Sequence, residues 1–250
     1  MQKNDRKELI VEFLNKNGFA SVSELSKNFY ASESSIRRDL TDLENSGFIK
    51  RSWGGAKALI SPNNITTFSS RSYTAYKEKT AIAKKAATLI KSGDIIFLDQ
   101  SSTAYFLAIE LLNYANLTII TNNLEILSVL SKSDHTVIST GGTLSKKNRN
   151  CLIGPATVKS YESIYADYAF FSVHSLSDNG IASDCTQEET FVRDAMIANA
   201  KKKILLCDST KIGTASSFRQ CALTDIDMLI CDIDVREKFK AIAPNLIFDY

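Results

Sequence analysis

The chain has 250 residues, 44% of them hydrophobic and 23% charged, which predicts one large or two ordinary globular domains. Its net charge of +2 is too small for a protein that binds polyanions over its whole surface. The five cysteines form no CxxC pair and only two histidines are present, so we expect neither a metal site nor a cofactor. No apolar run reaches the ~20 residues of a membrane span. The charged, amphipathic start is unlike a signal peptide. We therefore expect a cytoplasmic protein with no membrane partner.

The first 57 residues predict three helices and a wing. The first helix spans 5–16, and the second opens at a capping box in which Glu24 follows Ser21 by three residues. Ser32 can cap the third helix. The short interval between the second and third helices is typical of a helix-turn-helix.

The third helix carries the features expected of a DNA-reading helix. Ile36, Leu40 and Leu43 recur at i, i+4 and i+7, which predicts one buried face. The other face is rich in hydrogen-bond donors, and a helix of this kind suits the major groove of DNA. The residues predicted to contact DNA from this helix are Ser34, Ser35, Arg37, Arg38 and Thr41.

A short basic strand is expected to follow that helix. Gly47 ends the helix, and residues 48–51 predict a strand whose Lys50 and Arg51 suit the phosphate backbone. Trp53 begins the turn of the wing and completes the predicted DNA contacts. We therefore assign residues 1–57 to a winged helix-turn-helix.

Residues 58–76 lack clear periodicity and are predicted to be a linker. From residue 77 to 250, helical stretches alternate with short apolar runs, which indicates an α/β domain with a largely parallel sheet covered on both faces. The predicted helices are 78–91, 103–112, 124–131, 155–161 and 188–200. The predicted strands are 95–98, 117–120, 136–138, 167–173, 204–207, 228–231 and 246–248.

Polar residues follow four of these strands, where open parallel sheets bind their ligands. The turn before the helix at 103–112 offers backbone N–H groups to an anion, and a lysine can add a countercharge. Hydroxyl, amide and carboxylate groups of this kind fit a phosphorylated polyol, although the same residue types also form ordinary turns and caps. The candidate effector residues are Asp99, Ser101, Ser102, Thr103, Thr121, Asn122, Gly141, Gly142, Glu189, Asp208 and Lys211.

Glu189 has a second interpretation. It stands three residues after Thr186, as in a capping box, and one turn before Arg193, with which it can pair. His135 and His174 are isolated and no triad partner is evident for either.

These residues resemble the DeoR family of bacterial transcriptional regulators over essentially the whole chain. The resemblance rests on the IRRDL run at 36–40 and the SWGGA turn at 52–56. It also rests on the strand-end motifs FLD at 97–99, TN at 121–122, GG at 141–142 and DSTK at 208–211. It implies a C-terminal sensor domain similar in fold to ribose-5-phosphate isomerase. It also implies a homo-oligomeric repressor of a sugar-use operon that releases double-stranded operator DNA when it binds a sugar phosphate.

Four positions depart from the family pattern. Ser101 stands where the family has glycine, and a serine adopts positive φ less readily, so we expect this loop to differ in shape. Ser172 and Ser175 also replace glycines, and Trp53 replaces a histidine.

Two alternatives remain open at this point. The sensor domain can be degenerate and bind no ligand, as the three serines suggest. Alternatively, the chain can be a sugar-phosphate isomerase in which Asp99 or Glu189 is the base and Lys211 an electrostatic partner. One recognition helix contacts too few base pairs to specify a single site in a genome. If the protein is a regulator, we therefore expect it to be at least a dimer.

Overall fold

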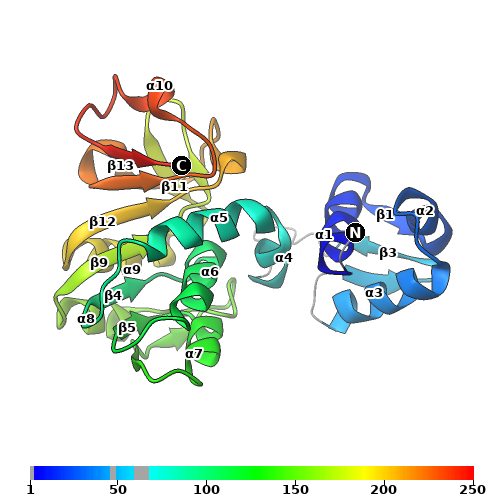
Figure 1. Cartoon of the computed structure of the whole chain (residues 1–250), viewed down its shortest axis with the longest axis horizontal. Helices are drawn as coiled ribbons and strands as arrows, with labels where there is room; N and C mark the ends of the chain where they lie inside the picture. Colours follow the sequence, from blue (N-terminus) through cyan, green and yellow to red (C-terminus); the bar gives the residue numbers. More distant parts are fainter. Residues whose placement is uncertain (1–2, 46–48, 59–67) are drawn as a thin grey trace. The chain divides into compact units, whose positions relative to one another are not determined.

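The computed structural model of the protein describes residues 3–45, 49–58 and 68–250. The chain divides into two compact units, residues 1–76 and 77–250 (Figure 1). Gly47 and Phe48, which the sequence assigns to the end of the third helix and to the wing, lie outside the described residues.

The N-terminal unit is a helix-turn-helix joined to a small antiparallel sheet. Its buried core includes Ile10 and Leu14 of the first helix, Leu25 of the second, and Ile36 and Leu40 of the third. The predicted capping box of the second helix is present, with Ser21 and Glu24 in reciprocal hydrogen bonds. The elements are α1 (Lys3–Asn17), β1 (Phe19–Ser21), α2 (Val22–Asn28), α3 (Glu33–Asn45), β2 (Ile49–Ser52), β3 (Gly55–Ala58) and α4 (Phe68–Tyr73).

The sheet of this unit has the order β1-β3-β2, so β3 is the central strand. The sequence predicts only one strand of this sheet, the basic strand. The other two, β1 and β3, are not predicted because they are too short to show a period. Side chains alternate between the two faces of the sheet. One row across the strands consists of Ala20, Ala56 and Arg51, whose two alanines are buried. The neighbouring row, on the opposite face, consists of Phe19, Lys57 and Lys50, all exposed.

The C-terminal unit is built on a seven-stranded sheet in which every pairing is parallel. The strand order is β15-β14-β12-β9-β4-β5-β6. Successive strands are added on one side of β4 as far as β6, and from β9 onward they are added on its other side. All carboxyl ends therefore meet at one edge. The strands are β4 (Ile95–Leu98), β5 (Thr118–Thr121), β6 (Thr136–Ser139), β9 (Ala166–Phe171), β12 (Ala200–Leu206), β14 (Met228–Ile230) and β15 (Ile247–Asp249).

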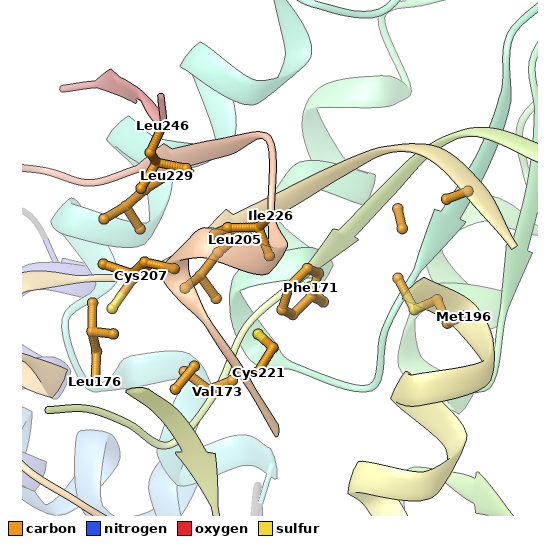
Figure 2. Close-up of a cluster of buried hydrophobic side chains, with 14 of the residues drawn as sticks. Phe171, Val173, Leu176, Met196, Leu205, Cys207, Cys221, Ile226, Leu229 and Leu246 are labelled. Atoms are coloured by element: carbon orange, nitrogen blue, oxygen red, sulfur yellow. The ribbon is translucent and has the colours of Figure 1, made fainter. Parts of the chain in front are cut away.

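Both faces of this sheet are covered, as the apolar strands predict. On one face, Ile96 and Leu98 join a core formed with three of the helices. On the other face, Phe97 lies with Phe171, and the latter is drawn with Met196 in Figure 2. The helices of the unit are α5 (Tyr76–Ala87), α6 (Ser102–Leu111), α7 (Leu124–Leu130), α8 (Pro155–Glu162), α9 (Gln187–Ala198) and α10 (Arg236–Phe239).

A second, antiparallel sheet packs against the core of Figure 2 and is not evident in the sequence. It has the order β10-β11-β13, and Leu176, Ala182 and Cys221 place one residue from each strand in the core. Its strands are short and mixed in character, so neither a period of two nor a continuous apolar run marks them. The remaining strands are β7 (Thr143–Leu144), β8 (Leu152–Ile153), β10 (Ser175–Leu176), β11 (Ile181–Asp184) and β13 (Phe218–Ala222).

Candidate DNA-binding surface and effector site

The exposed face of α3 carries the predicted DNA-contacting residues. Ser34, Arg38 and Thr41 recur at i, i+4 and i+7 opposite the buried residues and form one exposed stripe. Arg37 lies beside this stripe, where its guanidinium donates to Glu33 at 2.8 Å. Arg38 forms no ion pair with any residue in the described part of the chain. Ser32 accepts from the backbone N–H of Ser35 and caps the helix as predicted.

A buried carboxylate holds α3 against α1. Asp39 is fully buried, and its Oδ2 accepts from Arg6 Nε at 2.6 Å. One turn further along, Lys7 donates to Asp42 at the same distance. Asp39 is not among the site residues predicted from the sequence. It stands three residues after Ile36 and directly before Leu40, so its position falls on the apolar face of the helix. This spacing was the signal in the sequence that Asp39 is buried.

The wing places its predicted residues at different points of the hairpin. Arg51 turns toward α3, where its Nη1 donates to Thr41 Oγ1 at 3.1 Å. Lys50 is exposed on the opposite face of the sheet, and Trp53 is fully exposed at the tip. The structure thus joins Arg51 to the recognition helix and presents Lys50 and Trp53 to solvent.

The candidate effector residues lie along the carboxyl edge of the large sheet. The order of the strands reverses between β4 and β9, and in open α/β sheets the ligand crevice lies at such a switch point. Asp99 follows β4 and Ser172 follows β9, so both stand at this place. The carboxylate of Asp99 joins them, since it accepts from Ser172 N at 3.2 Å.

Arg193 of α9 is the centre of a buried charge cluster that sequence reasoning missed. It is only 2% exposed and pairs with Asp99 and Asp184, each at 3.1 Å. Its Nη1 also donates to Gln220 of β13 at 2.6 Å. Burial alone would lower the pKa of the guanidinium, but the charges of Asp184, Asp99 and Glu189 outweigh it and raise that pKa. Arg193 is therefore charged, and it ties the loop after β4 to the second sheet.

Glu189 does not form the predicted capping box. Thr186 is the N-cap of α9 but makes no side-chain capping bond. Glu189 is instead buried and accepts from Gln100 Nε2 at 3.1 Å, and Gln100 in turn accepts from Asn122 at 3.4 Å. Helix α9 directs Glu189 toward the strand ends, where its donor is Gln100. This residue lies far from Glu189 in the sequence, so local patterns do not reveal the pair. Glu189 and Asn122 are thus joined through Gln100.

The turn that opens α6 has an ordinary backbone. Ser101 has φ −74° and ψ 155°, and its hydroxyl caps the helix by accepting from Ala104 N. Ser101 thus adopts a conformation that any residue can take, and whether the loop differs in shape from the glycine-containing loop of the family stays a prediction. Ser172 and Ser175 also have ordinary φ values. Behind this cap, Thr103 is fully buried and its Oγ1 has no hydrogen-bond partner among the described residues.

A lysine cluster lies at the ends of β9 and β12. Lys211 Nζ donates to Ser172 Oγ at 2.7 Å and lies 3.3 Å from Asp208. Burial by itself would raise the pKa of the Asp208 carboxyl, but the charges of Lys211 and Lys79 leave it below its usual value. Lys79 of α5 is 3% exposed. Its spacing from Ala83 puts it on the buried face of its helix, which was the signal available in the sequence.

The remaining predicted residues make local contacts. Thr121 accepts from Asn123 N, and the carbonyl of Gly141 accepts from Thr157. Gly142 has φ +114°, and an added Cβ would lie 2.1 Å from Thr157 Oγ1, so this position requires glycine. Among the described residues, no hydrogen bond joins these three to the Asp99 or Lys211 clusters.

Other classes of site are not evident in the part of the chain that the structure describes. No group of three or more His, Cys, Asp or Glu side chains is placed to hold a metal ion. Within the same residues, no helix combines the length and the apolar character needed to cross a membrane.

Comparison with known proteins gives the same two-part division. The model of the DeoR-like helix-turn-helix domain matches residues 6–61, and that of the DeoR C terminal sensor domain matches residues 74–233. The uncharacterized HTH-type transcriptional regulator YulB of Bacillus subtilis is 36% identical over 91% of this chain and 88% of its own length. The glycerol-3-phosphate regulon repressor of Escherichia coli is 31% identical over 93% of this chain and 92% of its own length. The fold also overlaps in part with ribose 5-phosphate isomerase A of Methanocaldococcus jannaschii, with a TM-score of 0.42, 17% identity and 55% of each chain covered.

The fold and these matches define a DNA-binding transcriptional regulator with a sensor domain. The chain belongs to the DeoR family.

Proposed function

We propose that the protein represses a carbohydrate-use operon. We further propose that a phosphorylated sugar, bound at the carboxyl edge of the large sheet, controls the affinity of the protein for its operator. The observation that carries the proposal is the polar cluster at the switch point between β4 and β9. It combines the N-terminus of a 10-residue helix with the buried hydroxyl of Thr103, which has no hydrogen-bond partner among the described residues. Lys211, held beside Ser172, supplies the countercharge for a phosphate.

The carboxylates of the cluster suit a binding site better than a catalytic one. Asp99 is engaged by Arg193 and Ser172, and Glu189 accepts from Gln100, so each has a fixed partner. A base that abstracts a proton next to a carbonyl must instead face its substrate. We therefore favour a cytoplasmic sensor without catalytic activity over an isomerase. Proton NMR of the protein mixed with ribose 5-phosphate is expected to show no ketose, and turnover would reverse this choice.

A melting screen tests the sensor proposal. We expect at least one of glycerol 3-phosphate, glucose 6-phosphate, fructose 6-phosphate and ribose 5-phosphate to raise the melting temperature. A ligand at 100 times its Kd adds about 2.7 kcal/mol to the free energy of unfolding. Lys211→Met is expected to abolish the shift, while Lys240→Met, which removes an exposed lysine elsewhere in the unit, retains it. If no sugar phosphate produces a shift, the ligand-free alternative holds.

The DNA-binding proposal assigns different tasks to the two arginines of α3. Arg38 lies on the exposed stripe and forms no ion pair within the described part of the chain, so we assign it to base edges. Arg37 lies beside the stripe and suits a phosphate. Arg38→Ala is expected to reduce the preference for an operator over a scrambled duplex by about 1–3 kcal/mol. Arg37→Ala is expected to weaken binding to both duplexes.

Gel-shift titrations at one salt concentration measure these effects, using a duplex that the wild-type protein selects from a random pool. Lys27→Ala is the control, since this exposed lysine lies in the last turn of α2. Equal effects of the three substitutions would contradict the assignment of α3 to the groove. We further propose a homo-oligomer with at least two recognition helices, for which the selected duplex should contain two half-sites about 34–36 Å apart, or a multiple of that distance.

A further inference from the structure

His174 is held by a triangle of hydrogen bonds at the edge of the second sheet. Its Nδ1 lies 3.2 Å from Ser175 Oγ and 3.0 Å from Ser216 Oγ, and the two hydroxyls lie 2.8 Å apart. Ser175 begins β10, whereas Ser216 lies in the loop before β13, so the triangle joins segments far apart in the chain. His174 has no evident partner in the sequence, but the fold supplies two.

A buried serine supports this triangle. The backbone N–H of Ser216 donates to Ser183 Oγ at 2.9 Å, and Ser183 stands directly opposite Ser175 in the register of β10 and β11. Both Ser175 and Ser183 are buried. Ser175 occupies a position where the family pattern has glycine, which would supply no hydroxyl. The triangle is therefore a feature of this chain and not of that pattern.

The triangle leaves the second ring nitrogen of His174 available. The side chain is exposed, and its Nε2 has no hydrogen-bond partner among the described residues. A neutral imidazole carries its proton on one nitrogen only, so a serine hydroxyl that donates to Nδ1 places that proton on Nε2. His174 thus presents an N–H donor on the side of the ring away from the serines.

This donor is close to the proposed effector site. His174 follows Ser172 by two residues, and Ser172 Oγ accepts from Lys211 Nζ at 2.7 Å. Two residues of chain span about 7 Å at most, which limits the distance between the Cα atoms of Ser172 and His174. The loop that follows Lys211 also runs beside β10, since Gly213 N donates to Leu176 O at 2.8 Å. Lys211 and His174 can therefore contact different groups of one small ligand.

The carboxylates on the flanking segments are already paired. Asp184, next to Ser183 on β11, pairs with Arg193 at 3.1 Å, and Asp178, in the turn between β10 and β11, pairs with Lys238 at 2.6 Å. A second anionic group on a ligand is thus not opposed by a bare negative charge on either segment. Hydrogen bonds to an ionised acceptor are about twice as strong as those between neutral groups, so a carboxylate suits the Nε2–H best.

We propose that His174 Nε2 donates to the carboxylate of a phosphorylated sugar acid whose phosphate is bound beside Lys211. The effector class is then an aldonic acid phosphate and not the corresponding aldose phosphate, which has no charge at that end. The inference rests on the proposed sensor function and deepens it, because it names the chemical class of the effector. His174 determines the specificity, and Ser175 and Ser216 position its ring.

Matched pairs of ligands test this specificity. The pairs are glyceraldehyde 3-phosphate with 3-phosphoglycerate, ribose 5-phosphate with 5-phosphoribonate, and glucose 6-phosphate with 6-phosphogluconate, whose members differ in the carboxylate. In calorimetric titrations of the full chain, we expect at least one acid to bind about 10- to 150-fold more tightly than its aldose, as a hydrogen bond to a charged group implies. His174→Ala should remove this preference and leave the affinity for the aldose nearly unchanged.

Two neighbouring serines provide a variant and its matched control. Ser216→Ala removes one hydroxyl that holds the ring, and should reduce the preference for the acid about 2- to 10-fold, as the loss of a neutral hydrogen bond implies. Ser217→Ala makes the same change at the next residue of the loop, which is exposed, and should leave the preference at the wild-type value.

Nitrogen-15 NMR of the imidazole rings gives a readout that a purely structural role of His174 would not change. The chain has only two histidines, and the ring of His135 is buried between Leu111 and Leu117, to whose backbones it is hydrogen-bonded. Saturation with the acid should shift the Nε2 resonance of His174 and leave both His135 resonances in place. His174→Ala assigns the two rings.

The outcomes separate this inference from the sensor function. Aldoses that bind as tightly as their acids in every pair would overturn it, as would a His174 resonance that does not respond to a bound acid. In both cases the sensor function stands. If no member of any pair binds, the inference fails, and the melting screen with the other sugar phosphates decides whether the sensor function fails with it.

Discussion

Arg193→Met is expected to lower the free energy of unfolding of the C-terminal unit by about 3–5 kcal/mol, the usual cost of removing one partner from a buried ion pair. The side chain is 2% exposed and forms ion pairs with two carboxylates, those of Asp99 and Asp184. The charge of Glu189 also stabilises the charged guanidinium. Methionine fills a similar volume but leaves these negative charges together in the interior. Urea unfolding followed by circular dichroism measures the loss.

Two further variants make this prediction specific. Arg236→Met removes an exposed arginine paired with Asp234 on the same unit and should leave the urea midpoint almost unchanged. Arg193→Lys should recover only part of the loss, because a single ammonium cannot reproduce the guanidinium fork that binds Asp99, Asp184 and Gln220 at once. Equal destabilisation by Arg193→Met and Arg236→Met would contradict the assignment of Arg193 as the link between the strand-end loop and the second sheet.

Asp39→Ala is expected to cost the small N-terminal unit about 1.5–3 kcal/mol, the contribution of a hydrogen bond to a charged group. The substitution leaves the Arg6 guanidinium without its carboxylate and removes one of the two ion pairs that join α3 to α1. A domain of about 60 residues has only a few kcal/mol of stability, so the loss is a large fraction of the total. We expect operator binding to fail at temperatures where the wild-type protein still binds, while the C-terminal unit melts as before.

Asp42→Ala provides the comparison for that substitution. It breaks the adjacent pair with Lys7, but the Asp42 side chain is 41% exposed, and pairs of this kind contribute about 0.2–1 kcal/mol. Differential scanning calorimetry resolves the transition of each unit. A melting temperature of the N-terminal unit that falls equally in the two variants would show that burial of Asp39 does not anchor the helix.

The sequence predicts the elements whose residues repeat with a clear period. Ile36, Leu40 and Leu43 mark α3, and uninterrupted apolar runs mark the parallel strands, such as β4 at Ile95–Leu98. It does not reveal β1, β3 or the sheet β10-β11-β13. These strands are two to five residues long, and their pairing depends on segments far apart in the chain, as between β11 and β13.

The candidate site follows the same division. The strand-end rule leads from sequence to Asp99, Asn122, Asp208 and Lys211, because the position of a residue after a strand is a local property. The partners of these residues are not local. Arg193 lies 94 residues from Asp99, and Ser172 lies 39 residues from Lys211. Which side chains satisfy a buried charge is decided by the fold, so one sequence read by its local patterns cannot supply them.

The serine that opens α6 has an energetic consequence for any ligand of this edge. A glycine at position 101 would give the unfolded and unliganded chain more backbone conformations than a serine does. With φ at −74° and its hydroxyl already spent on the helix end, Ser101 holds the loop in one shape before a ligand arrives. A sugar phosphate bound at this edge, as proposed, would therefore lose less entropy on association, and its affinity would depend on its contacts more than on the ordering of this loop.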